Sequence, residues 1–223
     1  MQQSYDDKYA GEAYYWGRAP STMARRILEF IQPTDDFHPL LLDIGCGEGR
    51  DAVHFARLGF RVVGLDASER GLEKTRALAD EFGVEVETLC ADLKAWEPDR
   101  EYDVIFSTGA LQYLPAHVRG GRFAQYKAAT APGGIHILSV FVHKPFIPPA
   151  PDANEDEILF WPGEMLEYYD DWEIPHFAED IFDCDSGGVP HRHAMQRIAA
   201  WRYRGTRRDC SPQRPQRAQR EPS

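Results

Sequence analysis

The stretch Leu40-Leu41-Leu42-Asp43-Ile44-Gly45-Cys46-Gly47-Glu48-Gly49 decides the fold of this 223-residue chain. An apolar run ends near an acid, glycines follow at alternate positions, and helix-like sequence begins at Arg50. This order predicts a buried strand, a tight turn and the start of a helix. Glycine permits positive φ and lets a ligand approach the backbone, and the N-terminus of a helix favours anionic or electron-rich groups. We therefore expect a nucleotide-like ligand on this turn.

Strand-like and helix-like segments alternate through residue 142. Ser68 is a good helix N-cap and Gly59 and Gly83 are good helix stops. The expected strands are 40–44, 61–66, 84–89, 102–107 and 135–142, and the expected helices are 21–31, 50–58, 68–82 and 117–130. Segments 172–182 and 192–204 are expected to be strands, with helix as an alternative for the second, and 163–171 a short helix. This alternation predicts an α/β fold with a parallel sheet covered on both faces and ligands at the carboxyl ends of its strands.

Three segments flank this pattern within an expected single domain, residues 1–204. Residues 1–20 hold five aromatic side chains and are either a packed arm or a lid over a ligand. The proline-rich and acidic segment 143–162 is expected to be a loop over the strand ends, because long loops in compact domains tend to be functional. The arginine-rich tail, 205–223, is expected to be disordered.

Composition limits the partners and the compartment. A formal net charge of −11 argues against a general binder of nucleic acids or anionic membranes. No apolar run approaches the roughly 20 residues that span a bilayer, and the first residues lack the features of a signal peptide. Four cysteines without CxxC pairing indicate a reducing compartment, so we expect a cytoplasmic protein without nucleic-acid or membrane partners.

Two further acids follow later strands. Asp66 lies 23 residues after Asp43 (66 − 43), and Asp92 follows the third expected strand. A carboxylate at the end of the second strand can accept hydrogen bonds from both hydroxyls of a ribose. The glycine spacing differs from the G-x-G-x-x-G dinucleotide fingerprint, which disfavours an NAD-type oxidoreductase. Residues 40–142 resemble the class I S-adenosylmethionine-dependent methyltransferases, whose first motif has this form.

That resemblance implies a doubly wound, mostly parallel seven-stranded sheet with an antiparallel C-terminal strand, and S-adenosylmethionine as cofactor. It implies that Asp66 holds the ribose, that Ala67 packs near the adenine, and that Asp92 and the Leu93 backbone bind the adenine edge. Thr108 would pass close to the methionine part. The residues expected to bind the cofactor are Asp43, Gly45, Cys46, Gly47, Gly49, Asp66, Ala67, Asp92, Leu93, Thr108 and Trp16.

A narrower resemblance concerns the methyl acceptor. Segments 14–21, 101–107 and 190–194 are similar to the tellurite-resistance (TehB-like) methyltransferases. This implies a small acceptor whose nucleophile is a chalcogen, such as a thiol, selenite or tellurite. The residues expected to line the acceptor pocket are Tyr15, Gln112, Tyr113 and Trp161, although core packing is the commoner fate of aromatic side chains.

His191, Arg192 and His193 are the candidate catalytic residues. A basic cluster near the strand ends suits an oxyanion, and a histidine can take a proton near neutral pH. The alternative is a polar hairpin with no catalytic part. A metal site would combine Cys184 with the two histidines, but their spacing matches no established zinc pattern, so we expect no metal.

Other functions stay open at this point. The acceptor atom can instead be an oxygen or nitrogen of a small metabolite. A protein of another class, a module that binds S-adenosylmethionine without catalysis, would bind the cofactor and turn over no acceptor. For the enzyme we expect a monomer or a weakly associated homodimer.

Overall fold

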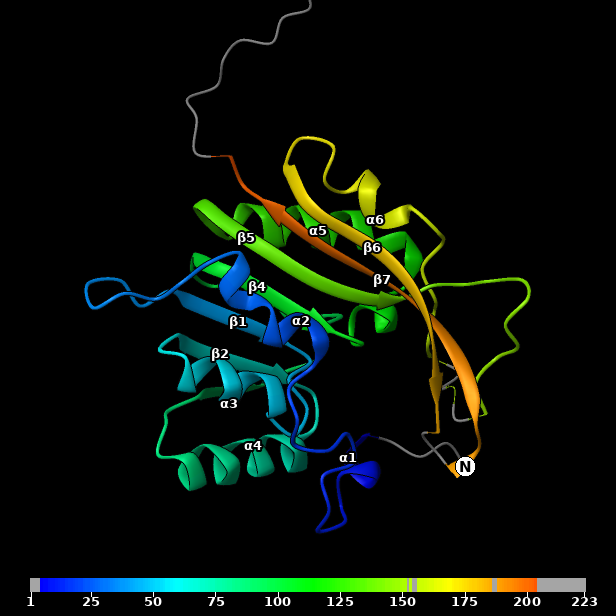
Figure 1. Cartoon of the computed structure of the whole chain (residues 1–223), viewed down its shortest axis with the longest axis horizontal. Helices are drawn as coiled ribbons and strands as arrows, with labels where there is room; N and C mark the ends of the chain where they lie inside the picture. The colour runs from blue at the N-terminus through cyan, green and yellow to red at the C-terminus, as the bar shows by residue number, and fades with distance from the viewer. Residues whose placement is uncertain (1–4, 152, 154–155, 186–187, 204–223) are drawn as a thin grey trace, which may run out of the picture.

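The computed structural model describes residues 5–151, 153, 156–185 and 188–203. In this part of the chain a single seven-stranded sheet has the order β3-β2-β1-β4-β5-β7-β6 (Figure 1). Its strands are β1 (Leu40–Ile44), β2 (Arg61–Asp66), β3 (Glu87–Cys90), β4 (Tyr102–Thr108), β5 (Thr130–Phe141), β6 (Glu173–Cys184) and β7 (His191–Trp201). Strands β1 to β5 pair in parallel, whereas β7 runs antiparallel to both β5 and β6. The mostly parallel α/β sheet with an antiparallel C-terminal strand is therefore confirmed.

Helices cover both faces of the sheet, because successive side chains of a strand point to opposite faces. On one face, Leu41 and Phe106 pack with Phe55 of an adjacent helix. On the other face, Leu42 and Ile105 pack with Phe123. The helices are α1 (Tyr5–Lys8), α2 (Thr22–Arg25), α3 (Arg50–Arg57), α4 (Glu69–Phe82), α5 (Ala116–Ala128) and α6 (Glu164–Glu167), with 3-10 turns η1 (Ile27–Glu29) and η2 (Leu111–Tyr113). Each fully buried large apolar side chain contributes about 1.5–3 kcal/mol to this packing.

Local signals fix the ends of α4. The Ser68 side chain accepts a hydrogen bond from the Gly71 N–H at 3.1 Å, and Gly83 follows the last turn with φ 65°. Both ends were expected from the sequence. The expected 21–31 helix is shorter: α2 ends where the Arg26 N–H bonds back to Met23, and η1 replaces the rest. Leu28, which lies in this segment, is 38% exposed.

Two expected strand starts were wrong. Residues 131–134, which precede the expected strand 135–142, belong to β5, because backbone hydrogen bonds join Gly133 and Gly134 to Arg202 after β7. Strand β3 begins at Glu87, three residues later than expected. The last strand, β7, is confirmed as a strand, and it pairs with β5 and β6 along most of its length.

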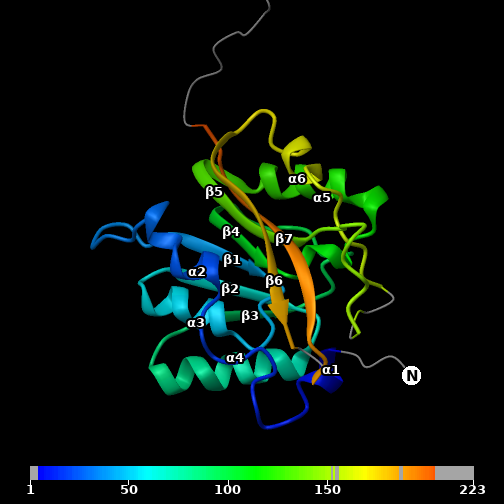
Figure 2. The same ribbon diagram turned by 45° about the vertical axis from the view of Figure 1, so that its right-hand side comes forward.

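Two irregular segments lie at the carboxyl ends of the strands. Helix α1 lies at the same end of the sheet as the tips of β6 and β7 (Figures 1 and 2). The chain after β5 is held by the buried guanidinium of Arg119, which pairs with Glu164 at 2.9 Å and lies 3.7 Å from the ring centre of Phe160. It also donates to the carbonyl groups of Leu114 and Ile158. The loop is thereby tied to α5.

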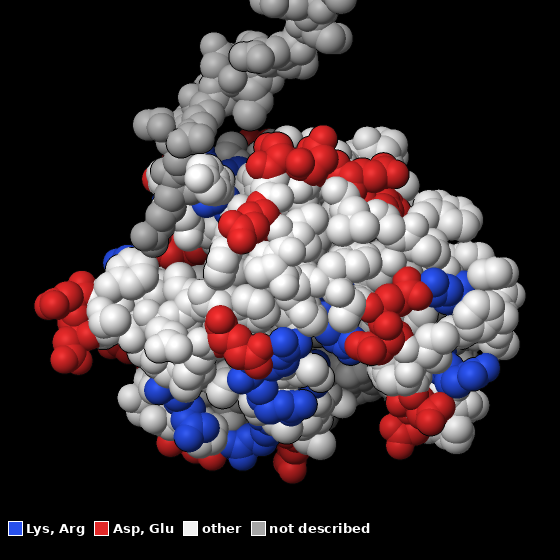
Figure 3. Space-filling view, turned by 45° about the horizontal axis from the view of Figure 1, so that its top comes forward, with Lys and Arg blue, Asp and Glu red and all other residues white. Residues whose placement is uncertain are grey.

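The surface carries mixed charge. On the face shown in Figure 3, Lys and Arg side chains are interspersed with Asp and Glu. No helix among the described residues is long and apolar enough to cross a bilayer. The tail that was expected to be disordered lies outside the described residues.

Candidate functional site

A cavity of about 620 Å³ lies at the carboxyl ends of the parallel strands. Its wall combines the turn after β1, the ends of β2 to β4, the N-terminal arm, and the tips of β5 to β7. Ten of the eleven residues expected to bind the cofactor lie in this wall: Asp43, Gly45, Cys46, Gly47, Asp66, Ala67, Asp92, Leu93, Thr108 and Trp16. Gly49 is instead the N-cap of α3 and packs against Thr75 of α4. The strand ends thus converge on one space large enough for a nucleotide-sized ligand.

The turn after β1 can be built only with glycine at key points. Gly45 and Gly49 have φ of 75° and 84°. A Cβ on Gly45 would lie 2.2 Å from the Cβ of Ala110, and one on Gly49 would lie 2.7 Å from Thr75. Both glycines therefore allow close approach of the turn to its neighbours as well as a left-handed backbone.

Asp43 and Thr108 face the cavity with unsatisfied oxygens. Asp43 is 2% exposed, and its Oδ2 has no hydrogen-bond partner among the described residues. The buried Oγ1 of Thr108 is likewise without a partner in that part of the chain. Burial, reinforced by Asp51 and Asp66, raises the pKa of Asp43 well above its usual value. A buried acceptor that lacks a partner is costly, so these oxygens favour a ligand with hydrogen-bond donors.

The carboxylate of Asp66 is fixed by the backbone around it. It accepts hydrogen bonds from the N–H groups of Gly47 at 2.8 Å and Ser68 at 2.9 Å. Burial raises the pKa of Asp66, and these hydrogen bonds oppose the rise. Asp92 is exposed and accepts from the Lys94 N–H at 2.8 Å. Each carboxylate keeps lone pairs for a ligand, since an ionised carboxylate offers about four acceptor sites.

The N-terminal arm closes one side of the cavity. Tyr9 is buried, and its hydroxyl lies against Gly47, where a Cβ would come within 2.8 Å of it. The Trp16 indole N–H donates to this hydroxyl at 3.3 Å. The hydroxyls of Tyr5 and Tyr113 lie 2.8 Å apart. The arm is therefore both packed on the domain and part of the cavity wall, which combines the two interpretations left open by the sequence.

Sequence reasoning missed several polar residues of the wall. Glu48 is 3% exposed, pairs with Lys74 at 2.7 Å and accepts from the Trp16 N–H. Asp51 accepts from the Ser21 N–H at 2.6 Å. Glu48 lies within the glycine turn and Asp51 lies directly after it, and this position in the sequence could have identified both as residues of the site. They hold the arm against the turn.

The residues expected around the acceptor are distributed differently. Tyr113 lies in the cavity wall. Gln112 is buried and donates to the Gly109 carbonyl at 2.6 Å and to Glu157, which does line the cavity. Tyr15 packs edge-on against Trp16, and Trp161 is 65% exposed beside His143. Gln112 and Tyr15 therefore pack against residues of the cavity wall, and Trp161 lies on the surface away from the cavity.

The C-terminal hairpin supplies the far wall. Phe182, Cys184, His193 and Met195 line the cavity. The Nε2 atoms of His191 and His193 lie 2.8 Å apart. His191 and the exposed Arg192 line a neighbouring hollow beside Pro148, Pro149 and Pro151. Of the three candidate catalytic residues, His193 is the one in the main cavity.

Comparison with known proteins agrees with this geometry. Residues 41–134 match the methyltransferase domain family. Over 142 residues the chain is 26% identical to a probable S-adenosyl-L-methionine-dependent methyltransferase, TehB, of Haemophilus influenzae, which covers 63% of this chain and 48% of that protein. The chain therefore spans about half the length of this curated relative. In its matched region and in its fold, the chain is similar to the class I S-adenosylmethionine-dependent methyltransferases. Within that class it resembles TehB.

Solved structures have the same fold. Haemophilus influenzae TehB superposes with a TM-score of 0.71 at 22% identity, covering 89% of this chain and 65% of that one. A structure that concerns the conversion of a disulfide bond into a thioacetal group during echinomycin biosynthesis gives 0.61 at 21% identity, covering 91% and 89%. The 1,6-didemethyltoxoflavin-N1-methyltransferase of Burkholderia thailandensis, with 1,6-didemethyltoxoflavin and S-adenosylhomocysteine bound, gives a TM-score of 0.57 at 22% identity, covering 82% of this chain and 77% of that one.

Proposed function

We propose that this protein transfers the methyl group of S-adenosylmethionine to a small-molecule acceptor whose nucleophile is a chalcogen. The observation that carries the proposal is the cavity in which the glycine turn, Asp66, Asp92 and the β6–β7 hairpin meet. The buried Asp43 Oδ2 and Thr108 Oγ1 suit the donor groups of the methionine part. A nearby cation would favour the ionised form of Asp43 and so offset the cost of its burial.

The other residues of the wall have matching roles. Asp66 accepts from the ribose hydroxyls, and Asp92 with the Leu93 backbone binds the adenine edge beside Ala67. Trp16 and Tyr9 cover the ligand and exclude water. The sulfonium of S-adenosylmethionine supplies a methyl group attached to a good leaving group. The protein's part is to position the acceptor for in-line displacement in a water-poor site.

The far wall favours a soft acceptor atom. Phe182 and Met195 are apolar, while Cys184 and His193 supply the polar groups that act on the nucleophile. The TehB likeness and the likeness to a protein of disulfide and thioacetal chemistry support sulfur, selenium or tellurium as that atom. Tyr113, backed by Gln112, bounds this space. We keep the cytoplasm as the proposed compartment, since Cys46 and Cys90 are free thiols.

An acceptor panel with methyl-labelled S-adenosylmethionine tests the proposal. Thiols, selenite and tellurite are compared with phenols and amines, and S-adenosylhomocysteine is measured as the common product. We expect kcat/KM for the best chalcogen acceptor to exceed that of every phenol and amine. The reverse order would favour O- or N-methylation instead. Binding of S-adenosylmethionine with no turnover on any acceptor would favour a non-catalytic module.

One observation favours the second enzyme function. The methyltransferase with S-adenosylhomocysteine and 1,6-didemethyltoxoflavin bound has this fold and is named an N1-methyltransferase. An N-methyltransferase of a small heterocycle is therefore the alternative that the same panel distinguishes.

A further inference from the structure

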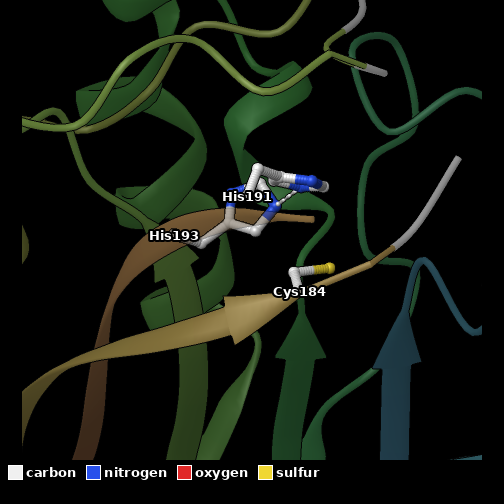
Figure 4. A group of neighbouring side chains, drawn as sticks. All are labelled: Cys184, His191 and His193. Atoms are coloured by element: carbon white, nitrogen blue, oxygen red, sulfur yellow. Dashed lines mark hydrogen bonds between the residues drawn. The ribbon is translucent and has the colours of Figure 1, made fainter. Parts of the chain in front are cut away.

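Three potential metal ligands meet at the tip of the β6–β7 hairpin. Cys184 ends β6, and His191 begins β7 as its direct cross-strand partner. His193 follows two residues later on the same face of β7 (Figure 4). The Cys184 sulfur and one nitrogen of each histidine all lie within 4.8 Å of one another. The short zinc-binding sequence patterns do not describe this arrangement, because strand pairing and not a turn brings the ligands together.

The hydrogen bonds of His191 leave the right nitrogen for a metal. Its Nδ1 lies 2.7 Å from the carbonyl oxygen of Val189, which can only accept, so Nδ1 carries the proton. A metal can then bind through the lone pair that the other nitrogen, Nε2, carries in a neutral ring. Metal-binding histidines are commonly fixed in this way by a carbonyl on the other ring nitrogen.

The two histidine rings contact each other through their Nε2 atoms. One of the two Nε2 atoms must donate to the other across the 2.8 Å between them. The two Nε2 atoms therefore face each other and share one proton. A Zn²⁺ ion in place of this shared proton would be held by both nitrogens. Zn–N and Zn–S bonds of about 2.0–2.3 Å place tetrahedral ligand atoms roughly 3.3–3.6 Å apart. Movements of about 1 Å by the three side chains would therefore bring their ligand atoms to coordination distance.

We propose that Cys184, His191 and His193 bind one Zn²⁺ ion whose fourth coordination position opens into the main cavity. Cys184 and His193 both line that cavity, and Phe141 packs at 4.6 Å from the His193 ring and holds it there. Three protein ligands with one open position are typical of catalytic zinc, whereas structural zinc has four protein ligands. A thiolate and two imidazoles suit Zn²⁺ better than Mg²⁺ or Ca²⁺.

Zinc at this site would activate a thiol acceptor for methyl transfer, an inference that rests on the function proposed above. A thiol that enters the open position loses its proton to solvent and binds as a thiolate. Its sulfur attacks the methyl carbon, the bond from that carbon to the sulfonium sulfur breaks, and S-adenosylhomocysteine leaves as a neutral thioether. The methylated acceptor is also a thioether, a weaker ligand, and it dissociates.

Metal titration of the full chain tests the site without any methyl donor. Chelator-treated protein is titrated with Zn²⁺ against a chromophoric chelator, and with Co²⁺ to observe the thiolate-to-cobalt charge-transfer band. We expect one ion per chain and a band that Cys184→Ser abolishes. His191→Gln and His193→Gln should each weaken Zn²⁺ binding by more than the 10- to 100-fold typical of losing an outer-shell partner.

Matched controls use residues away from the hairpin. Cys90→Ser and His117→Gln remove an exposed cysteine and an exposed histidine elsewhere, and they should bind Zn²⁺ as the wild type does. No Zn²⁺ binding, or equal binding by Cys184→Ser and the wild type, would overturn the site. That result would leave the proposed function intact. Conversely, Zn²⁺ binding as expected with no methyl transfer to any acceptor would overturn the proposed function alone.

Discussion

The hydroxyl of Tyr5 lies 2.8 Å from that of Tyr113, so that α1 is joined to η2 across the cavity. The two rings also meet edge to face, with centres 5.6 Å apart. Burial raises the pKa of Tyr5 to about 12, so both partners of this contact keep their protons at neutral pH. The arm and the turn after β4 therefore form one wall.

Tyr113→Phe should weaken cofactor binding through this wall. The substitution removes one partly buried hydrogen bond, which is worth about 1 kcal/mol, or roughly 5-fold in Kd for S-adenosylhomocysteine. Calorimetry measures the change. Tyr203→Phe is the matched control, because Tyr203 is 72% exposed. Equal affinities of the two variants would contradict a role for the arm in binding.

Asp43→Asn should stabilise the free protein and weaken cofactor binding. Burial raises the pKa of Asp43, so the folded state binds more protons than the unfolded state above the unfolded pKa, and stability falls as pH rises through that window. Asparagine has no charge to bury. We expect Tm at pH 7 to rise by at least about 2 °C. Wild-type S-adenosylmethionine binding should release a proton from Asp43, detectable by calorimetry in buffers of different ionisation enthalpy, and the variant should release less.

His136 should make the fold sensitive to acid. It is fully buried, with its ring nitrogens 2.7 Å from Thr130 Oγ1 and 2.6 Å from the Tyr169 hydroxyl. Burial lowers the pKa of His136 to about 3. Between this value and about 6.5 the unfolded state binds the extra proton, so stability falls as pH drops below 6.5.

Urea unfolding between pH 4 and pH 7 measures this dependence. His136→Gln should reduce the slope of unfolding free energy against pH, whatever its effect on absolute stability. His117→Gln changes an exposed histidine and should leave the slope unchanged. A slope in His136→Gln as steep as in the wild type would mean that other groups carry the acid sensitivity.

Gly45→Ala should be more damaging than Gly83→Ala. Both glycines have positive φ, of 75° and 65°. A Cβ on Gly83 meets nothing within 4 Å, whereas one on Gly45 would lie 2.2 Å from Ala110. Strain alone costs about 1–3 kcal/mol, and the clash adds to it only at Gly45. Denaturant unfolding that gives equal losses would show that the turn can relax away from Ala110.

Periodic local signals were enough to predict much of the fold. The cap at Ser68, the stop at Gly83 and the apolar runs of β1 and β2 are each encoded within a few residues. The extension of β5 over 131–134 was not predictable, because it depends on hydrogen bonds to Arg202, some 70 residues away. Local sequence patterns do not encode contacts between segments that are distant in the chain, so these features of the fold could not be predicted.

The same distinction holds for the site. The glycine turn and the acids at successive strand ends were visible because chain order alone brings them to one edge of the sheet. The packing of Tyr9 over Gly47 could not be predicted, because it depends on how the N-terminal arm folds back. The pairing of Cys184 with His191 could not be predicted either, because it depends on the register between β6 and β7. Trp161 was expected in the pocket from its residue type, and it lies on the surface.

The binding of S-adenosylhomocysteine, compared with NAD, tests the central claim most directly. Calorimetry should give one site per chain for S-adenosylhomocysteine and no heat for NAD. Asp66→Ala should weaken the former by about 1–3 kcal/mol, or roughly 5- to 150-fold, the scale of losing hydrogen bonds to a charged group. Binding of NAD with no response to S-adenosylhomocysteine would contradict the assignment of the turn. Wild-type affinity in Asp66→Ala would contradict the place given to the ribose.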